Sequence, residues 1–169
     1  MANLKKVTAP IGVRLFLNGK KISEDAQVTL PNIQPMTVDL QALGTLSYPL
    51  VGLLQDAEFS INQTGITKHY GEVNVFDKVS FEFRWVDIHV DDQGSEKHYG
   101  KKAFLVGRMK SSGAPQLQIG NETSLEGTYA MISYKLVDDG KTVIDIDRFA
   151  KKIIINGKNY YDDIGKLLD

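Results

Sequence analysis

The sequence contains no cysteine among its 169 residues. This absence excludes disulfide frameworks, thiolate zinc sites, iron–sulfur clusters and cysteine nucleophiles, and it is compatible with an intracellular origin. A chain of this length buries roughly 70% of the surface of its unfolded state on folding. We therefore expect a stable hydrophobic core that needs no metal and no disulfide.

The sequence also lacks a long apolar run. Its most apolar window, residues 43–54, is interrupted by glycine, serine and proline and is too short to span a bilayer. The first ten residues hold a charged pair with no apolar stretch behind it, which is not the pattern of a secretory signal. These features predict a soluble protein with no stable membrane association.

No excess of either charge is present. The chain has 20 basic and 21 acidic residues, a formal net charge of −1, and a similar balance in both halves. Proteins that neutralise many phosphates need a concentrated excess of Lys and Arg, so any contact with DNA should be weak or consist of passage without binding. With 42% hydrophobic and 24% charged residues, the composition is that of one globular domain over residues 1–169.

Turn residues are what the sequence does contain. Asn-Gly and Asp-Gly pairs between β-rich runs supply the positive φ angles of type I′ hairpin turns, and they occur at 18–19, 139–140 and 156–157. The first pair joins residues 13–17 to 20–22, the second joins 129–137 to 142–146, and the third joins 152–155 to 159–161. A mostly antiparallel β domain follows.

The clearest strand covers residues 79–90. Its apolar residues fall on odd positions up to Trp85 and on even positions from Val86. Since strand side chains alternate between faces, this shift predicts either a bulge near Trp85 and Val86 or a strand that changes which face is buried. After a polar turn the chain returns over residues 97–109, so residues 79–110 form a long hairpin.

Helical signals are few. Residues 65–78 could hold one short helix, which Gly71 weakens, and residues 160–168 could form a terminal turn or two. No repeat or linker divides the chain. The expected fold is therefore mainly β, an antiparallel sandwich or barrel with one short flanking helix.

Catalytic and metal-binding patterns are weak. His89 lies among Asp87, Asp91 and Asp92, and a strand would place positions 87, 89 and 91 on one face. A solvated polar face leading into an acidic turn explains the same residues, and no second ligand cluster is present. The serine and glycine spacings match neither a nucleophile elbow nor a phosphate loop. The expectation is that the chain is not an enzyme and has no cofactor and no metal.

Residues 43–54 are the informative anomaly. More than half of them are apolar, yet no clean helical or strand period survives. An apolar loop on a monomer surface would promote aggregation, so either the core of the subunit or a second subunit must cover it. The second alternative makes the chain a self-assembling module.

Several segments together resemble a known family. In chain order they are residues 15–19 (LFLNG), 28–31 (VTLP), 37–54 leading into 58–60 (EFS), 107–110 (GRMK), 120–122 (GNE), 133–136 (SYKL), 138–140 (DDG), 144–147 (IDID) and 156–157 (NG). Their order and spacing resemble the major tail tube proteins of contractile phage tails and of phage-tail-like (R-type) bacteriocins, the type found in P2-like phages. The neutral residues 110–117 depart from the acidic segment of that family.

The resemblance implies a small β-sandwich or barrel whose copies form stacked hexameric rings around a hollow conduit for DNA or other cargo. Residues 35–55 correspond to a loop that reaches neighbouring subunits. The expected interface residues are Leu43, Leu46, Tyr48, Leu50, Leu53 and Leu54. The implied partners are further copies of the chain, the tail sheath, the baseplate or spike and the tape-measure protein, with DNA only as passing cargo.

The resemblance also implies a location in the virion tail after assembly in the host cytoplasm, and a tube that sheath contraction drives through the target envelope. Two alternatives remain open at this point. The chain could form the tube of a bacterial secretion or extracellular injection system. It could instead be a monomeric β-sandwich binding module with an aromatic site, for which Tyr129 and the pair Tyr160 and Tyr161 are candidates.

Overall fold

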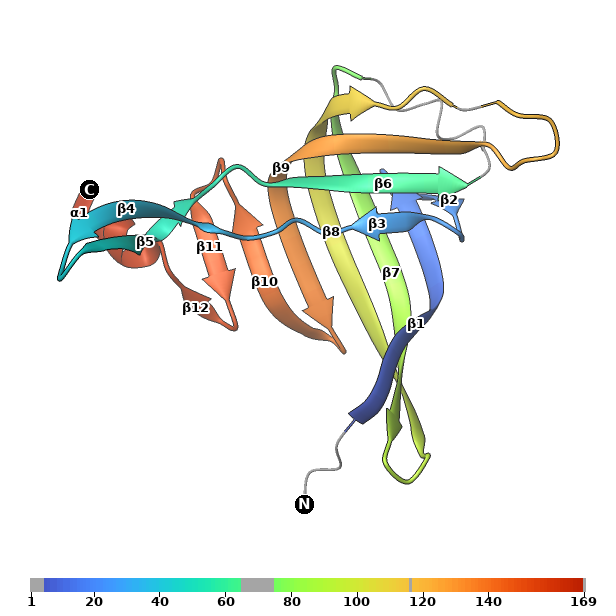
Figure 1. Cartoon of the computed structure of the whole chain (residues 1–169), viewed down its shortest axis with the longest axis horizontal. Helices are drawn as coiled ribbons and strands as arrows, with labels where there is room; N and C mark the ends of the chain where they lie inside the picture. The colour runs from blue at the N-terminus through green and yellow to red at the C-terminus, as the bar shows by residue number, and fades with distance from the viewer. Residues whose placement is uncertain (1–4, 65–74, 116, 169) are drawn as a thin grey trace.

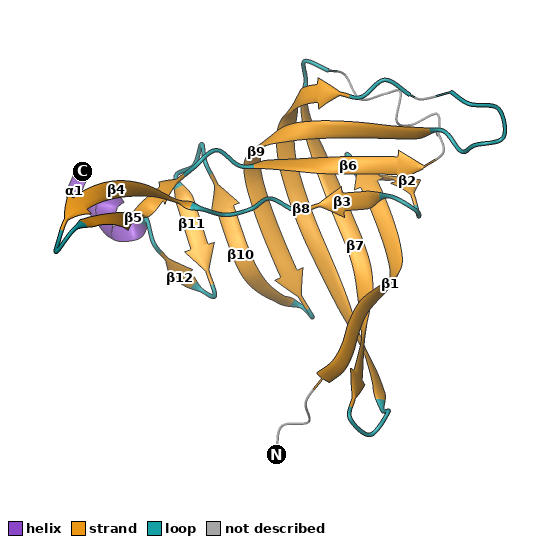
Figure 2. Ribbon diagram, viewed as in Figure 1, coloured by secondary structure: helices purple, strands orange, loops and turns teal. Residues whose placement is uncertain are grey.

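The computed structural model of the chain describes residues 5–64, 75–115 and 117–168. These residues form antiparallel strands and one short helix (Figures 1 and 2). The elements are β1 (Lys5–Leu17), β2 (Lys20–Ser23), β3 (Gln27–Thr29), β4 (Pro35–Gln41), β5 (Thr45–Leu54), β6 (Glu58–Thr64), β7 (Lys78–Asp91), β8 (Glu96–Ser112), β9 (Ser124–Asp138), β10 (Lys141–Asp147), β11 (Lys152–Ile155), β12 (Lys158–Asn159) and α1 (Asp162–Leu168).

The main sheet has the strand order β12-β11-β10-β9-β8-β7-β1-β2, with antiparallel neighbours throughout. Strand β9 is long enough to pair twice on one edge: its first half pairs with β6 and its second half with β10. Strand β6 in turn pairs with β3. These two strands cross the main sheet and form a second layer on one of its faces (Figure 1). The predicted mainly β, antiparallel fold with one short flanking helix is confirmed.

All three predicted turns are present. Asn18 and Gly19 have φ angles of 47° and 85°, and the other two pairs have similar positive values, as type I′ turns require. They connect β1 to β2, β9 to β10, and β11 to β12. Local chemistry alone therefore specified these connections.

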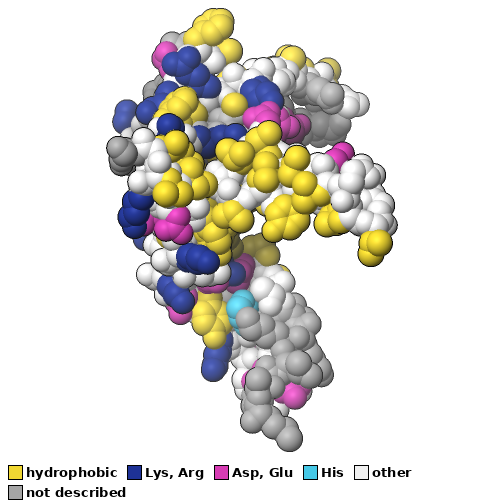
Figure 3. Space-filling model, turned by 90° about the vertical axis from the view of Figure 1, so that its left-hand side faces the viewer, with side chains coloured by type: hydrophobic (Ala, Val, Ile, Leu, Met, Phe, Trp, Pro, Cys, Tyr) yellow, Lys and Arg dark blue, Asp and Glu magenta, His cyan; other side chains and the backbone are white. Residues whose placement is uncertain are grey.

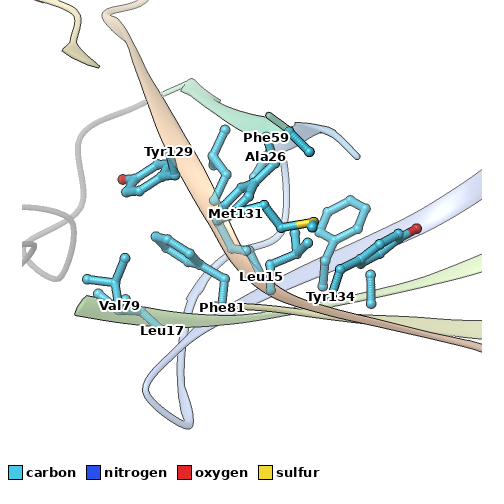
Figure 4. Packing of buried hydrophobic residues seen from close by; sticks show 14 of the residues in the cluster. Leu15, Leu17, Ala26, Phe59, Val79, Phe81, Tyr129, Met131 and Tyr134 are labelled. Atoms are coloured by element: carbon cyan, nitrogen blue, oxygen red, sulfur yellow. The ribbon is translucent and has the colours of Figure 1, made fainter. Parts of the chain in front are cut away.

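The core lies between the main sheet and the β3–β6 layer (Figure 4). Phe59, Phe81 and Tyr129 are all fully buried and come from β6, β7 and β9. The Phe59 and Tyr129 rings stack at 5.2 Å between centroids, and Phe81 meets Tyr129 edge to face at 5.1 Å. Tyr129 is thus a core residue rather than part of an open aromatic binding site. Tyr134 is also buried, and its burial raises the pKa of its hydroxyl group to about 12.

Strand β7 shows what the shift in the apolar pattern means. It pairs with β8 over residues 78–90 without a register shift, so the predicted bulge in β7 is wrong. The shift lies instead in β1, between Pro10 and Gly12, which face Asp87 and Val86. The buried face of β7 continues past Trp85 to Asp87, which is 6% exposed, whereas Val86 is 37% exposed. From Val86 onward the apolar residues of β7 lie on the opposite face of the strand, although its pairing with β8 continues without a bulge.

The helix predicted over residues 160–168 is α1, whose first turn carries Asp162 and Asp163. The possible helix at residues 65–78 lies mostly outside the described residues; residues 75–78 form a turn and the start of β7. Among the described helices, none has the length and apolar character that crossing a membrane requires.

Candidate subunit interface

The segment predicted to be an irregular loop is a β-hairpin. Strands β4 and β5 pair with each other to form a two-stranded sheet that is separate from the main sheet. We call this hairpin, residues 35–54, the arm; it extends from one end of the molecule (Figure 1). The expected loop is therefore a strand pair, although the apolar residues of β5 do not alternate regularly along its whole length.

The arm has one apolar face and one polar face. The cross-strand pairs Val38 with Tyr48 and Leu40 with Leu46 lie on one face, because these residues occupy even positions that face each other. The opposite face is polar except for Pro49, and its pairs are Thr37 with Pro49, Asp39 with Ser47 and Gln41 with Thr45. The arm is an amphipathic hairpin, the pattern typical of a strand pair with one face covered.

The apolar face of the arm is open to solvent within the subunit. The exposed fraction is 41% for Val38, 42% for Leu40, 48% for Leu46 and 51% for Tyr48. Hydrophobic side chains gather on this end of the molecule in Figure 3. Contiguous exposed apolar surface of this kind marks an interaction site, because a free monomer would aggregate through it.

The tip of the arm is a tight turn with Leu43 at its apex. Leu43 has a φ of 52° and is fully exposed, and Gly44 has a φ of 118°. The Ala42 amide donates to the Gly44 carbonyl at 2.8 Å. A leucine in the left-handed region is uncommon and strained, since its Cβ crowds the backbone. This strained, exposed leucine contributes nothing to the core of its own subunit.

The base of the arm is tightly held. Arg148 donates from its guanidinium to the carbonyl oxygens of Gln55 at 2.8 Å and Leu54 at 3.2 Å. The Gln55 side chain donates to the Pro35 carbonyl at 3.1 Å, which ties the two ends of the hairpin together. An isolated two-stranded hairpin is only marginally stable in water. These contacts therefore give the arm a defined direction.

Helix α1 packs beneath the arm at Gly52. A Cβ at this position would lie 2.6 Å from Ile164 Cδ1, and Gly52 has a φ of +84°. The positive φ favours glycine, and a side chain here would also displace the Ile164 methyl group. The terminal helix and the arm are thus packed together at one end of the molecule.

The predicted interface residues fall into two groups. Leu43, Leu46, Tyr48 and Leu53 are exposed on the arm, whereas Leu50 is half-buried and Leu54 packs at the base against the core. The structure adds three exposed residues of β4 that the prediction omitted: Met36, Val38 and Leu40. Their alternation with Thr37, Asp39 and Gln41 was the signal that could have identified them.

Two of the three acidic residues around His89 have other partners. Asp87 is buried and lies 2.9 Å from Lys101 Nζ, and Asp91 accepts from the amides of Gln93 and Ser95 in the β7–β8 turn. The His89 ring packs against Tyr99 with 4.5 Å between centroids. Within the described residues, no group of three potential metal ligands converges.

The Lys101 amine joins β7, β8 and β9. It lies 2.9 Å from Asp87 Oδ2 and 3.8 Å from Asp138 Oδ2. The hydrogen bond to Asp87 is the main cause that raises the pKa of Lys101. This arrangement neutralises the buried carboxylate, so its role is structural.

Comparison with known families gives one match that covers nearly all of the chain. A family model described as phage tail tube protein FII matches residues 11–168. The matched range begins in β1, ends with α1 and includes the arm. Comparison with curated protein sequences gave no match.

Proposed function

The chain belongs to the phage tail tube protein FII family, and from this premise we propose that its copies form hexameric rings that stack into the inner tube of a contractile tail. Members of the family are structural tail proteins, so the chain has a structural role in a tail tube. Family membership gives the structural role in a tail tube, and we propose in addition that the ring has six copies and that the tail is contractile.

The exposed apolar face of the arm is the observation that carries this proposal. It projects from the subunit, and the described residues leave 41–51% of Val38, Leu40, Leu46 and Tyr48 exposed, so a second chain has a surface to cover. An arm at one end of a molecule that docks on a different surface of the next molecule makes a heterologous contact, and such contacts close into rings or extend as filaments. Both geometries are needed in a tube built of stacked rings.

We propose that the tube is the rigid conduit of the tail. Contraction of a surrounding sheath would drive it through the target envelope, and DNA or other cargo would then pass along the lumen. The net charge of −1 supports passage without retention, since a polyanion is held by concentrated positive charge. The further partners in this proposal are the tail sheath, the baseplate or spike and the tape-measure protein, with assembly in the host cytoplasm before incorporation into the virion tail.

A second candidate is the tube of a bacteriocin, a secretion system or an extracellular injection system. It requires the same arm and the same self-assembly and differs only in the particle around the tube. A monomeric binding module is disfavoured at Tyr129, which is fully buried and stacked on Phe59. Tyr160 and Tyr161 are half-buried and lie next to Gly52 of the arm. Such a module would also leave the apolar face of the arm in water.

Negative-stain electron microscopy of the concentrated protein tests the proposal. We expect hollow tubes with sixfold end views from the unaltered chain. The double variant Leu40→Thr with Leu46→Thr removes one cross-strand apolar pair from the arm while keeping residues that favour strands, and it should yield monomers.

The matched control is Gln41→Thr with Ser47→Thr, which changes the polar face of the same hairpin and should still form tubes. Folded monomers of the unaltered chain under all conditions, including the presence of tail tube seeds, would contradict the proposal. Tubes from both double variants would show that the arm is not the interface.

A further inference from the structure

The main sheet and the β3–β6 layer are joined by strand pairing on one side and not on the other, as far as the described residues show. Following hydrogen-bonded neighbours, the strands run β2-β1-β7-β8-β9-β6-β3, and among the described residues no strand pairing joins β3 back to β1 or β2. One buried side chain crosses this gap: the Gln63 amide donates to the Ile22 carbonyl at 3.4 Å. We call the gap between β3 and β1 the seam.

A groove of about 380 Å³ lies along the seam. No charged residue lines it, and its wall is mostly apolar and half-buried. The groove is lined in part by Pro10, Val13, Gln27, Val28, Leu30 and Trp85. Several of them pack against the core from the open side, so the groove exposes an edge of the hydrophobic core.

Both strands that border the seam have a free edge. Strand β1 pairs with β2 only over Leu15–Leu17, so its earlier residues pair on one side, with β7. Of the strands that the structure describes, only β6 pairs with β3. Free edges next to an apolar groove recruit a further strand, because it satisfies backbone donors and acceptors while its side chains fill the groove.

We propose that the arm of a second copy of this chain occupies the seam groove; the inference rests on the proposed self-assembly. The chemistry of the two surfaces is complementary: the groove lining is uncharged, and Asp39 is the only charged residue between positions 35 and 54. The apolar face of the arm presents Val38, Leu40, Leu46 and Tyr48 to it.

The shape of the molecule makes this contact intermolecular. The arm extends from the end of the molecule opposite to β3, with its tip pointing away from the seam (Figure 1). It therefore cannot fold back into its own groove. Each copy offers an arm at one end and a seam at the other, which is the arrangement of a heterologous, ring-closing interface.

Trp85 provides a direct readout, because it is the single tryptophan of the chain and lines the groove. When tubes assemble, we expect its emission to shift to shorter wavelength and its quenching by acrylamide to fall. The arm variant Leu40→Thr with Leu46→Thr should leave both signals at their monomer values. Tubes whose Trp85 signals equal those of the monomer would overturn the inference while leaving the proposed function intact.

Crosslinking gives an independent test, since the natural chain has no cysteine. Thr45→Cys lies beside the tip of the arm and Gln27→Cys lies in the groove, and both positions are exposed. In assembled tubes a short bismaleimide should join the doubly substituted chains into a ladder of oligomers. Mixed single variants should give dimers only.

The matched control pairs Thr45→Cys with Lys135→Cys, an exposed position on β9 outside the groove. A ladder from the chain that carries Gln27→Cys, and none from the chain that carries Lys135→Cys, supports the inference. Tubes with no crosslink at position 27, or with crosslinks at position 135 instead, overturn it. Absence of tubes from the unsubstituted chain overturns the proposed function, so the two failures are distinguishable.

Discussion

The β7–β8 hairpin and the arm are built on the same local pattern and have opposite environments. In β7 the alternating residues Val79, Phe81 and Phe83 are at most 8% exposed, whereas Val38 and Leu40 in the arm exceed 40%. The exposed fractions differ because different elements pack against the two hairpins. The β3–β6 layer covers the face of β7 that carries these residues, as the contact of Phe81 with Phe59 shows, while the arm pairs with no described strand beyond its own two. An alternating pattern therefore predicts that a face is covered, and not which chain covers it.

Truncation of a core aromatic should have the largest effect on stability. Phe81→Ala removes a fully buried ring that contacts Phe59 and Tyr129, and we expect the free energy of unfolding to fall by about 3–5 kcal/mol. Tyr48→Ala in the arm is the matched change at an exposed aromatic, with an expected effect within about 0.5 kcal/mol. Urea unfolding of the monomers compares them, and equal losses would erase the contrast between the two hairpins.

Removing the ion pair between Lys101 of β8 and Asp87 of β7 should have the second-largest effect on stability. Lys101→Met leaves the buried Asp87 carboxylate without its cation, and we expect a loss of about 2–3 kcal/mol. Adding Asp87→Asn should restore part of this loss, because no buried charge then remains. A single variant as stable as the original chain would show that the pair contributes nothing.

The stability of the folded chain should fall at alkaline pH. The pKa of Lys101 is raised above its usual value of 10.5, so its stabilising contribution is complete below pH 10.5 and is lost as the pH rises through the raised value. Burial raises the pKa of Tyr134 from 10.0 to about 12, which likewise removes stability above pH 10. Urea midpoints measured between about pH 9 and pH 12 should fall, less steeply for Lys101→Met; a flat profile would contradict both assignments.

Loosening the base of the arm should have a smaller and local effect. Arg148→Ala removes two hydrogen bonds to backbone carbonyls, at an expected cost of about 1–2 kcal/mol. Hydrogen exchange should accelerate in residues 35–54 and remain unchanged in β7 and β8. Arg84→Ala removes an exposed arginine that pairs with Glu82 on the same strand; it is the control and should leave the exchange of the arm as it was. Equal protection of the arm in both variants would argue against the anchoring role of Arg148.

Relief of strain at the tip should have the smallest effect. Leu43→Asn places a residue that tolerates positive φ where leucine is strained, so the arm should gain about 0.5–1 kcal/mol. Leu43→Val, which is stiffer at its Cβ, should lose protection instead. Hydrogen exchange of the arm amides in the monomer measures both changes. If Leu43 contacts a neighbouring subunit, Leu43→Asn should nevertheless assemble less well.

Much of the fold could be predicted from local chemistry. The three turns at Asn18, Asp139 and Asn156 require only positive φ at the turn and alternating strands beside it, so they were readable in the sequence. The long hairpin was equally visible from its alternating apolar residues. The arm was partly hidden, because its regularly alternating residues 36–41 lie before the apolar window 43–54, and Gly52 interrupts the alternation in β5.

Local sequence was enough to specify the class of fold, the turns, the absence of thiol chemistry and the resemblance to tail tube proteins. Packing between distant segments settled that β7 keeps its register while β1 carries the shift, that Asp87 is neutralised by Lys101, and that no described strand pairing closes the seam between β3 and β1. The physical reason is that alternation and turn preference act over a few neighbouring residues. Which apolar face is covered depends on strands that are far apart in the chain, and for the arm we propose that it depends on a second copy of the chain.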